Sequence, residues 1–338
     1  MIELAVLGGG SWGTTLAHLG AVAGGRVRLW LRDGDTVREI HERRTNRRYT
    51  GAVSLADTIV ATDDLGAAVR GARLVLVAVP SHAARDVIRT LGGLALGDQI
   101  VVHAIKGLEA ETGQPISRIF REETAIRKLG VLSGPNIAPE ILAGLPAATV
   151  VASHYPEVVE VAQGALMNPR FRVYANDDVI GVELGGALKN IIAIAAGIVS
   201  GLGLGENARG LLMTRGLAEV ARFAVHHGAQ LLTLAGLAGM GDLVVTCSSV
   251  HSRNFRVGQG LAAGRPLPDI LRELGMVAEG VRTTRTVHRV AQRESLYMPI
   301  TAALARVLDG DLDVRQALAG LMEQPARAEV DADRVALR

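Results

Sequence analysis

The feature that most constrains the fold is a glycine-rich turn near the start of the chain. Gly8–Gly13 reads Gly-Gly-Gly-Ser-Trp-Gly, follows the apolar run Ile2–Leu7 and precedes a helix-like segment. In a strand–turn–helix unit, Gly8 permits the tight turn, Gly10 lets the backbone approach a diphosphate, and Gly13 lets the helix pack on the strand. Free N–H groups and the dipole at the helix start favour an anion there. The pattern predicts a dinucleotide-binding unit.

Short apolar runs alternate with helix-like segments through the first half of the chain. Several runs are continuous in Val, Ile and Leu, as expected for strands that are buried on both faces of a parallel sheet. The βαβ rhythm predicts a doubly wound, Rossmann-like sheet. The predicted strands are Ile2–Leu7, Val27–Leu31, Ile59–Ala61, Leu74–Val79, Ile100–Ala104, Val131–Ser133, Ala148–Ala152 and Arg172–Tyr174.

The strand rhythm stops at about residue 177, where the cluster Asn176-Asp177-Asp178 could cap a long helix. The remainder predicts helices only. The predicted class is therefore α/β plus all-α, with a dinucleotide-binding domain over residues 1–177 and a helical substrate-binding domain over residues 178–338. The predicted helices of the second domain cover residues 178–200, 208–227, 255–263, 279–293, 299–308 and 313–322.

Charge and cysteine content exclude several classes of protein. The formal net charge of +2 is too balanced for a nucleic-acid or membrane-surface binder. The single cysteine, Cys247, rules out an internal disulfide framework, and the first residues lack the basic region of a signal peptide. The longest nearly apolar stretch, Ile191–Gly205, is too short to span a bilayer. We expect a cytoplasmic protein without integral membrane contact.

Lysine is unusually rare in this chain. Of 36 basic residues only Lys106, Lys128 and Lys189 are lysine, so 33 are arginine. A remaining lysine can mark a position where the side chain must release a proton, because arginine does not do so at accessible pH. Lys106 follows the fifth predicted strand, at the edge where such sheets bind ligands. Lys189 lies on an apolar helix, where burial would disfavour its charge and suit a general acid or base; a snorkelling lysine is the structural alternative.

Two short segments carry further ligand chemistry. Arg32-Asp33 ends the second predicted strand, where an acidic residue usually takes the ribose hydroxyls of NAD. Arg32 could pair with a 2′-phosphate and Asp33 with ribose hydroxyls, so NADP is favoured and NAD is not excluded; plain solvated surface is the alternative for both residues. Ser252-Arg253-Asn254 precedes a helix and has the donors for a phosphate group; an ordinary helix cap is the alternative. Cys247 is predicted to be a small core residue rather than a nucleophile.

These features together resemble the bacterial-type NAD(P)-dependent glycerol-3-phosphate dehydrogenases, over roughly residues 2–325. The resemblance rests on many ordered motifs rather than on one. They are Gly8–Gly13, Val79–His82, Lys106–Glu109, Ser133–Asn136, Ala143–Pro146, Phe171–Tyr174, Gly185–Asn190, Asn207–Arg209, Thr214–Gly216, Gly241–Cys247, Ser252–Asn254 and Glu279-Gly280.

The resemblance implies reduction of dihydroxyacetone phosphate to sn-glycerol 3-phosphate for glycerophospholipid synthesis, with Lys189 as proton donor and acceptor. The residues that it implies for the substrate are Lys106, Gly134, Asn136, Lys189, Asp242, Ser252, Arg253 and Asn254. Those that it implies for NADP or NAD, beside the glycines Gly8, Gly10 and Gly13, are Ser11, Trp12, Arg32, Tyr49, Lys106, Ala138, Arg253, Val277 and Glu279. No metal is expected, and a homodimer is compatible with the chain although the sequence does not determine its oligomeric state.

One segment departs from the family pattern, because Asn136 stands where relatives carry a hydroxyl residue. Its amide can still donate, but its role is open. The nearest alternative enzyme is a β-hydroxyacid or 6-phosphogluconate type dehydrogenase, whose catalytic Lys and Asn are four residues apart; here Lys189 and Asn190 are adjacent. A non-catalytic dinucleotide sensor is the alternative of a different class, and such a protein has no use for a proton donor.

Overall fold

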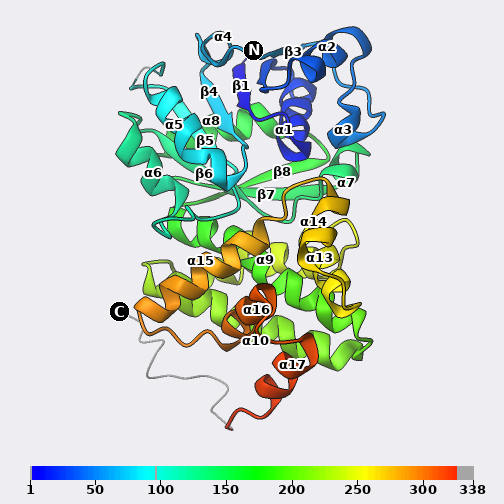
Figure 1. Cartoon of the computed structure of the whole chain (residues 1–338). Coiled ribbons are helices and arrows are strands. Elements are labelled where there is room, and N and C mark those ends of the chain that lie inside the picture. The colour runs from blue at the N-terminus through cyan, green and yellow to red at the C-terminus, as the bar shows by residue number, and fades with distance from the viewer. Residues whose placement is uncertain (1, 96, 326–338) are drawn as a thin grey trace. The chain divides into compact units, whose positions relative to one another are not determined.

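The computed structural model describes residues 2–95 and 97–325, and its contacts divide the chain into two compact units. Unit 1 covers Met1–Glu183 and unit 2 covers Leu184–Arg338. The division falls inside a long helix, α9 (Val179–Gly201), whereas the boundary expected near residue 177 lies just ahead of it. Each unit is described by itself below, and Figure 1 labels the elements.

Unit 1 contains an eight-stranded sheet with the order β3-β2-β1-β4-β5-β6-β7-β8. All pairs are parallel except β6 and β7, which run antiparallel. The first six strands thus follow the Rossmann order, and each of the eight predicted strands is confirmed with small shifts at its ends. The strands are β1 (Glu3–Leu7), β2 (Arg26–Trp30), β3 (Ile59–Thr62), β4 (Leu74–Val77), β5 (Ile100–His103), β6 (Leu129–Ser133), β7 (Ala147–Ala152) and β8 (Phe171–Asn176).

Helices cover both faces of this sheet, because successive strand side chains point to opposite sides. On β4, Leu74 and Leu76 enter one apolar core, whereas Val75 and Val77 enter the other. The first core includes residues of α1 and α8, and the second includes residues of α4, α5 and α6. The helical elements of unit 1 are α1 (Ser11–Val22), α2 (Gly34–Arg43), α3 (Arg47–Thr50), α4 (Leu65–Val69), η1 (Ser81–Ala83), α5 (Ala84–Gly92), α6 (Ile116–Glu123), α7 (Ala138–Leu142) and α8 (Pro156–Leu166).

The carboxyl ends of the central strands meet at one edge of the sheet. Leu7 pairs with both Trp30 and Val77, and Val77 pairs in turn with His103. The segments that leave these strands therefore start side by side. They carry the glycine turn after β1, Arg32 after β2 and Lys106 after β5, so the ligand-binding edge predicted from the sequence is formed.

Unit 2 is helical throughout its described part. The six predicted helices correspond to α9, α10, α13, α15, α16 and α17, whereas α11, η2, α12 and α14 were not predicted. The elements after α9 are α10 (Gly205–His226), α11 (Leu231–Leu234), the π-helical turn η2 (Leu237–Gly241), α12 (Asp242–Ser248), α13 (Arg253–Ala262), α14 (Leu267–Leu274), α15 (Glu279–Arg293), α16 (Pro299–Asp309) and α17 (Val314–Met322).

The expectation that no segment is long enough to cross a bilayer was wrong on length. By length and composition, two segments within residues 2–95 and 97–325 qualify, Val179–Gly201 with 23 residues and Leu231–Ser248 with 18 residues. The first is longer than the run Ile191–Gly205 suggested, because the helix also takes in the apolar residues around Lys189. Its most apolar window is 94% buried inside the protein, as in a core helix; the second, broken by η2, is 39% buried.

Candidate active site

The glycine turn between β1 and α1 has the geometry of a dinucleotide-binding loop. Gly8 has a φ of +120°, which side-chain-bearing residues rarely adopt. A Cβ on Gly13 would lie 1.8 Å from the carbonyl oxygen of Gly8, so only glycine allows α1 to pack this closely. By contrast, nothing lies within 4 Å of where a Cβ on Gly10 would be. The backbone at Gly10 is therefore accessible to a ligand, as predicted.

The start of α1 fits the diphosphate of a dinucleotide. No side chain caps this helix end, so its first amides are directed at the open space beside Gly10. The indole Nε1 of Trp12 is buried and has no hydrogen-bond partner among the described residues. An unfilled donor in the first turn, next to uncapped amides, suits an anionic ligand with several acceptors. The residues present thus fit NAD or NADP.

A second segment holds the glycine turn in place. The Ser11 hydroxyl donates to the backbone oxygen of Tyr49 at 2.7 Å. The buried Asn46 amide donates to the Gly9 oxygen and to the Thr14 hydroxyl, both at 2.9 Å. Ser11 and Tyr49 were predicted as nucleotide-binding residues, and the structure brings them together. Sequence reasoning missed Asn46, because one asparagine in a polar loop carries no pattern.

Arg32 and Asp33 follow β2 and differ in their surroundings. The carboxylate of Asp33 caps α2, accepting from the Asp35 amide and from the Thr36 hydroxyl. The Thr36 hydrogen bond, with smaller help from backbone amides and from Arg48, holds the pKa of Asp33 below its usual value. Asp33 is therefore engaged within its own helix, whereas the exposed Arg32 makes no hydrogen bond or ion pair within residues 2–95 and 97–325.

The predicted substrate residues of unit 1 lie together after β5 and β6. The Lys106 Nζ donates to the backbone oxygen of Gly134 at 3.0 Å. Asn136, which follows in the same loop, donates to the Ala148 oxygen and accepts from the Thr149 hydroxyl, each at 3.0 Å. These bonds hold the loop against β7. Asn136, which stands where relatives carry a hydroxyl residue, therefore has a structural role. Ala138, the first residue of α7, is half-buried close by in sequence.

Unit 2 contains a buried lysine on α9 with two side-chain partners on α12. Lys189 is 6% exposed and Asp242 1% exposed. The Lys189 Nζ donates to Asp242 Oδ1 and, at 2.6 Å, to the Thr246 hydroxyl, which in turn donates to the same carboxylate at 3.1 Å. A Cβ on Gly185 would lie 2.8 Å from the Ala238 oxygen, so the glycine one turn before Lys189 lets η2 approach α9. The snorkelling alternative fails because the ammonium is buried.

Thr246 is a site residue that sequence reasoning did not assign. Its one available signal was its position four residues after Asp242, which places both on the same face of α12. That signal could be used only if the segment were known to be helical. Cys247, beside it, is fully buried, and burial raises the pKa of its thiol to about 12. The thiol stays protonated, which fits the prediction of a core residue.

A second buried network lies next to the lysine. Asn254 Nδ2 donates to Asn190 Oδ1 at 2.8 Å, and Asn254 Oδ1 accepts from the Gly280 amide at 3.0 Å. Asn254 therefore joins α9, α13 and the first turn of α15. Glu279, predicted to contact the cofactor, is the first residue of α15, and Val277 lies just before it; both are half-buried.

The Ser252-Arg253-Asn254 triplet is partly used by the fold. The Ser252 hydroxyl caps α13 by accepting from the Phe255 amide at 3.2 Å, as the simpler of the two interpretations had it. The Asn254 side chain is occupied by the network described above. Arg253, the first residue of α13, is half-buried and remains the cation of the triplet that could meet a phosphate.

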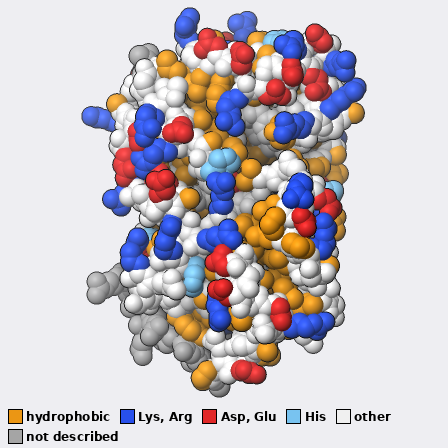
Figure 2. All heavy atoms as spheres, in the orientation of Figure 1, with side chains coloured by type: hydrophobic (Ala, Val, Ile, Leu, Met, Phe, Trp, Pro, Cys, Tyr) orange, Lys and Arg blue, Asp and Glu red, His pale blue; other side chains and the backbone are white. Residues whose placement is uncertain are grey.

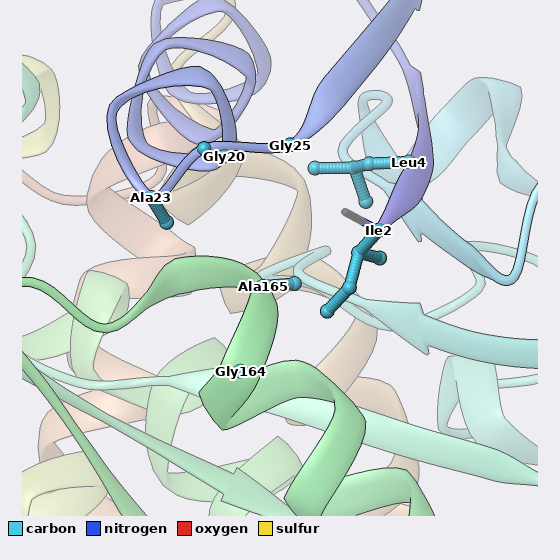
Figure 3. Close-up of a pocket in the computed structure, with 8 residues that line it drawn as sticks. Ile2, Leu4, Gly20, Ala23, Gly25, Gly164 and Ala165 are labelled. Atoms are coloured by element: carbon cyan, nitrogen blue, oxygen red, sulfur yellow. The ribbon is translucent and has the colours of Figure 1, made fainter.

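A small cavity of unit 1 lies away from these residues. It holds about 160 Å³ and is lined by Ile2, Leu4, Ala23, Ala165 and four glycines. Figure 3 shows Ile2, just before β1, and Leu4 of β1 beside Gly20 and Gly25, at the amino ends of the first strands. Its lining has no titratable side chain, and it lies at the opposite end of β1 from the glycine turn. We therefore assign it no part in the reaction.

A nucleotide-binding glycine turn on a Rossmann-like unit and a buried lysine on a helical unit are the features of a two-domain, nicotinamide-dependent oxidoreductase. Comparison with known proteins agrees. Residues 3–159 match the family model described as NAD-dependent glycerol-3-phosphate dehydrogenase N-terminus, and residues 178–319 match the corresponding C-terminus. The chain belongs to the NAD-dependent glycerol-3-phosphate dehydrogenase family, which confirms the resemblance seen in the sequence.

Individual relatives match nearly end to end. The glycerol-3-phosphate dehydrogenase [NAD(P)+] of Moorella thermoacetica is 48% identical over 97% of this chain and 98% of that protein. The protein of the same name from Geobacillus thermodenitrificans is 46% identical over 98% of this chain and 97% of that protein. A crystal structure of glycerol-3-phosphate dehydrogenase from Coxiella burnetii has 40% identity and a TM-score of 0.92, covering 95% of this chain and 98% of that one.

Proposed function

We propose that the protein reduces dihydroxyacetone phosphate to sn-glycerol 3-phosphate with NADPH or NADH, and that Lys189 gives and takes the proton. The observation that carries this proposal is the buried contact of the Lys189 ammonium with Asp242 and Thr246. When bound, the nicotinamide supplies the hydride. The protein must then neutralise the oxygen of the former ketone, and Lys189 has the chemistry for it.

The surroundings of Lys189 support this role. Its ammonium can polarise a carbonyl oxygen and then deliver a proton to the alkoxide. Asp242 stabilises the charged form, and the Thr246 hydroxyl orients the Nζ by accepting one of its hydrogens. With the lysine and the aspartate almost fully buried, bulk water does not screen the field of the ammonium.

The remaining predicted residues have roles that follow from the same proposal. In unit 1, the glycine turn, Ser11 and Trp12 would hold the diphosphate, and Lys106 would face the substrate. In unit 2, Arg253 would pair with the substrate phosphate, whereas Ser252 and Asn254 would act by holding the start of α13. The Lys189–Asp242–Thr246 group argues against a dinucleotide sensor, which needs no proton donor.

Three wider proposals go with the activity. The product would enter glycerophospholipid synthesis, the protein would act in the cytoplasm, and it would form a homodimer. Burial of the apolar surface of α9 inside the protein supports the second. Cell fractionation and light scattering on the purified protein would test the second and the third.

The direct test is the absorbance of NADPH and NADH at about 340 nm with and without dihydroxyacetone phosphate. We expect oxidation of the cofactor only when the substrate is present. Binding of the cofactor without any substrate-dependent oxidation would favour the sensor. Oxidation driven by a 3-hydroxyacid partner instead would favour the β-hydroxyacid type.

A further inference from the structure

The end of β2 carries Arg32, and the carboxylate of Asp33 beside it caps α2. In a dinucleotide-binding fold this position faces the adenosine ribose, and an acidic residue there usually accepts from the ribose hydroxyls. Asp33 is the only acidic residue in the segment that directly leaves β2, up to the first residue of α2, and its carboxylate already accepts from Asp35 and Thr36. Hydrogen bonds from the ribose hydroxyls would compete with the hydrogen bonds by which Asp33 caps α2. The segment is therefore poorly suited to the unphosphorylated ribose of NADH.

Arg48, on the short helix α3, lies at the same place. Its charge acts on Asp33, which puts its guanidinium near the end of β2. The guanidinium also lies over the Tyr49 ring, 5.3 Å from the centroid. Because the Ser11 hydroxyl binds the Tyr49 backbone and Asn46 binds the glycine turn, α3 is held against the diphosphate loop. Arg48 is thus positioned by the same contacts that position the nucleotide.

Arg32 and Arg48 are not tied down as Arg38 and Arg44 are. Arg38 pairs with Asp35, and Arg44 donates to two backbone oxygens and lies 3.5 Å from Asp57. In the described part of the chain, Arg32 and Arg48 instead make no hydrogen bond and no close ion pair, and both are exposed. Two guanidinium groups beside the single carboxylate of Asp33 leave a net positive charge, which an anionic ligand would neutralise.

We propose that Arg32 and Arg48 together bind the 2′-phosphate of NADPH, and that Arg48 is a residue through which the protein prefers NADPH to NADH. This deepens the proposed function and rests on its nucleotide dependence. A phosphate monoester offers three oxygens, enough for a forked donor from each arginine. The Asp33 carboxylate stays ionised beside this site, so the two guanidinium groups must outweigh its charge as well as bind the phosphate.

The test is the binding of adenosine 2′,5′-bisphosphate and of 5′-AMP by calorimetry, which needs no catalysis. The two probes differ in the 2′-phosphate alone. For Arg48→Ala we expect the affinity for the bisphosphate to fall about tenfold or more, as for loss of a hydrogen bond to a charged group. The affinity for 5′-AMP should fall by much less. Arg48→Lys should recover part of the loss, because it keeps the charge and loses the fork.

Arg47→Ala is the matched control, since Arg47 is the exposed neighbour on α3 and acts on Glu39 instead. It should leave both affinities unchanged. Arg32→Ala should resemble Arg48→Ala, and the double variant should lose less than the product of the two single losses, because one phosphate serves both. Equal loss for both probes in Arg48→Ala would show that Arg48 only supports the loop, and no loss would remove it from the site.

These outcomes are separate from the fate of the proposed function. If the wild-type protein fails to oxidise either cofactor with dihydroxyacetone phosphate, the proposed reaction is wrong, yet the calorimetry still decides the phosphate site. If the reaction is found and Arg48→Ala binds both probes like the wild type, the two-arginine site alone is wrong.

Discussion

At the scale of single residues, the choice of lysine at position 189 is the informative one. The chain uses arginine almost everywhere a positive charge is needed, so a lysine paired with a buried aspartate points to a group that must release its proton. Asp242 could hold a guanidinium equally well. What an arginine could not do is return a proton at neutral pH.

Substitution of Lys189 separates charge from proton transfer. If the residue gives and takes a proton, Lys189→Arg should lose nearly as much kcat as Lys189→Ala, about 10²–10⁴-fold for general acid–base catalysis. NADPH binding, followed by fluorescence, should survive in both variants because the glycine turn belongs to unit 1. A kcat near the wild-type value in the arginine variant would reduce Lys189 to an electrostatic role and leave Lys106 as the candidate acid.

His103 predicts a pH dependence of stability. It ends β5, is fully buried, stacks on Phe120 and lies 3.6 Å from the buried Glu183. Burial lowers the pKa of His103 to about 3, from 6.5. Below pH 6.5 the unfolded chain therefore binds a proton at this histidine, whereas the folded protein does not. The stabilisation that depends on a neutral His103 is fully present above pH 6.5 and is lost as the pH falls towards 3.

His103→Phe should flatten the acid side of the stability curve. Within this window the free energy of unfolding of the wild type falls by about 1.4 kcal/mol per pH unit because of His103. The variant lacks the histidine and therefore lacks this pH dependence. Burial raises the pKa of Glu183 to about 7, which acts in the opposite sense between pH 4.5 and 7, so the comparison is cleanest below pH 4.5, where Glu183 is protonated in both the folded and the unfolded protein. Urea unfolding of both proteins at several pH values would measure this difference. If the free energies of unfolding of the two proteins changed with pH in parallel, His103 would not be the source of the acid instability.

At the scale of elements, close helix packing depends on single glycines. Gly185→Ala should destabilise the protein by about 1–3 kcal/mol, because its Cβ would lie 2.8 Å from the Ala238 oxygen and must push η2 away from α9. Since η2 leads directly into Asp242, kcat should fall as well.

Gly210→Ala is the matched control, because this glycine lies inside α10 with nothing within 4 Å of a new Cβ. It should stabilise the protein by up to about 1 kcal/mol. Thermal unfolding of both variants checks the pair. A similar loss in both would mean that the close approach of η2 is not what Gly185 provides.

Elements were predictable where local pattern and tertiary role agree. The strands of unit 1 were found because burial on both faces leaves continuous apolar runs such as Leu74–Val77. The antiparallel pairing of β6 with β7 was not predicted, because the direction of a strand is set by the connection that leads to it and not by the strand's own sequence. In unit 2, α12 was missed because the glycines of η2 break the helical period just before Asp242. Lys189 and Asp242, which lie in contact, were both singled out from the sequence, but their partner Thr246 could be recognised only once the helix was known.

At the scale of the whole molecule, the formal net charge of +2 is small for 338 residues. Figure 2 shows acidic and basic side chains interspersed on the face that it draws, in keeping with the net charge of +2. Long-range attraction therefore adds little, and an anionic substrate must be recognised by local contacts.

Dihydroxyacetone phosphate should accordingly be reduced far better than dihydroxyacetone. The phosphate would supply binding energy remote from the carbonyl, which holds the reacting carbon in place and raises kcat as well as lowering KM. Steady-state kinetics with both ketones measures the difference. Comparable kcat/KM values would show that the start of α13 does not bind a phosphate.

The scarcity of lysine also makes the chain a convenient object for chemical labelling. Lys128 and Lys106 are both half-buried, Lys128 against Glu157, and Lys189 is shielded beside Asp242. An amine-directed acylating reagent should therefore modify Lys189 last, and a protease that cleaves after arginine places each lysine on a different peptide, because acylated lysine is no longer cleaved. Mass spectrometry could then follow the exposure of each lysine separately, so that the opening of α9 away from α12 would be read from one peptide as delayed labelling of Lys189.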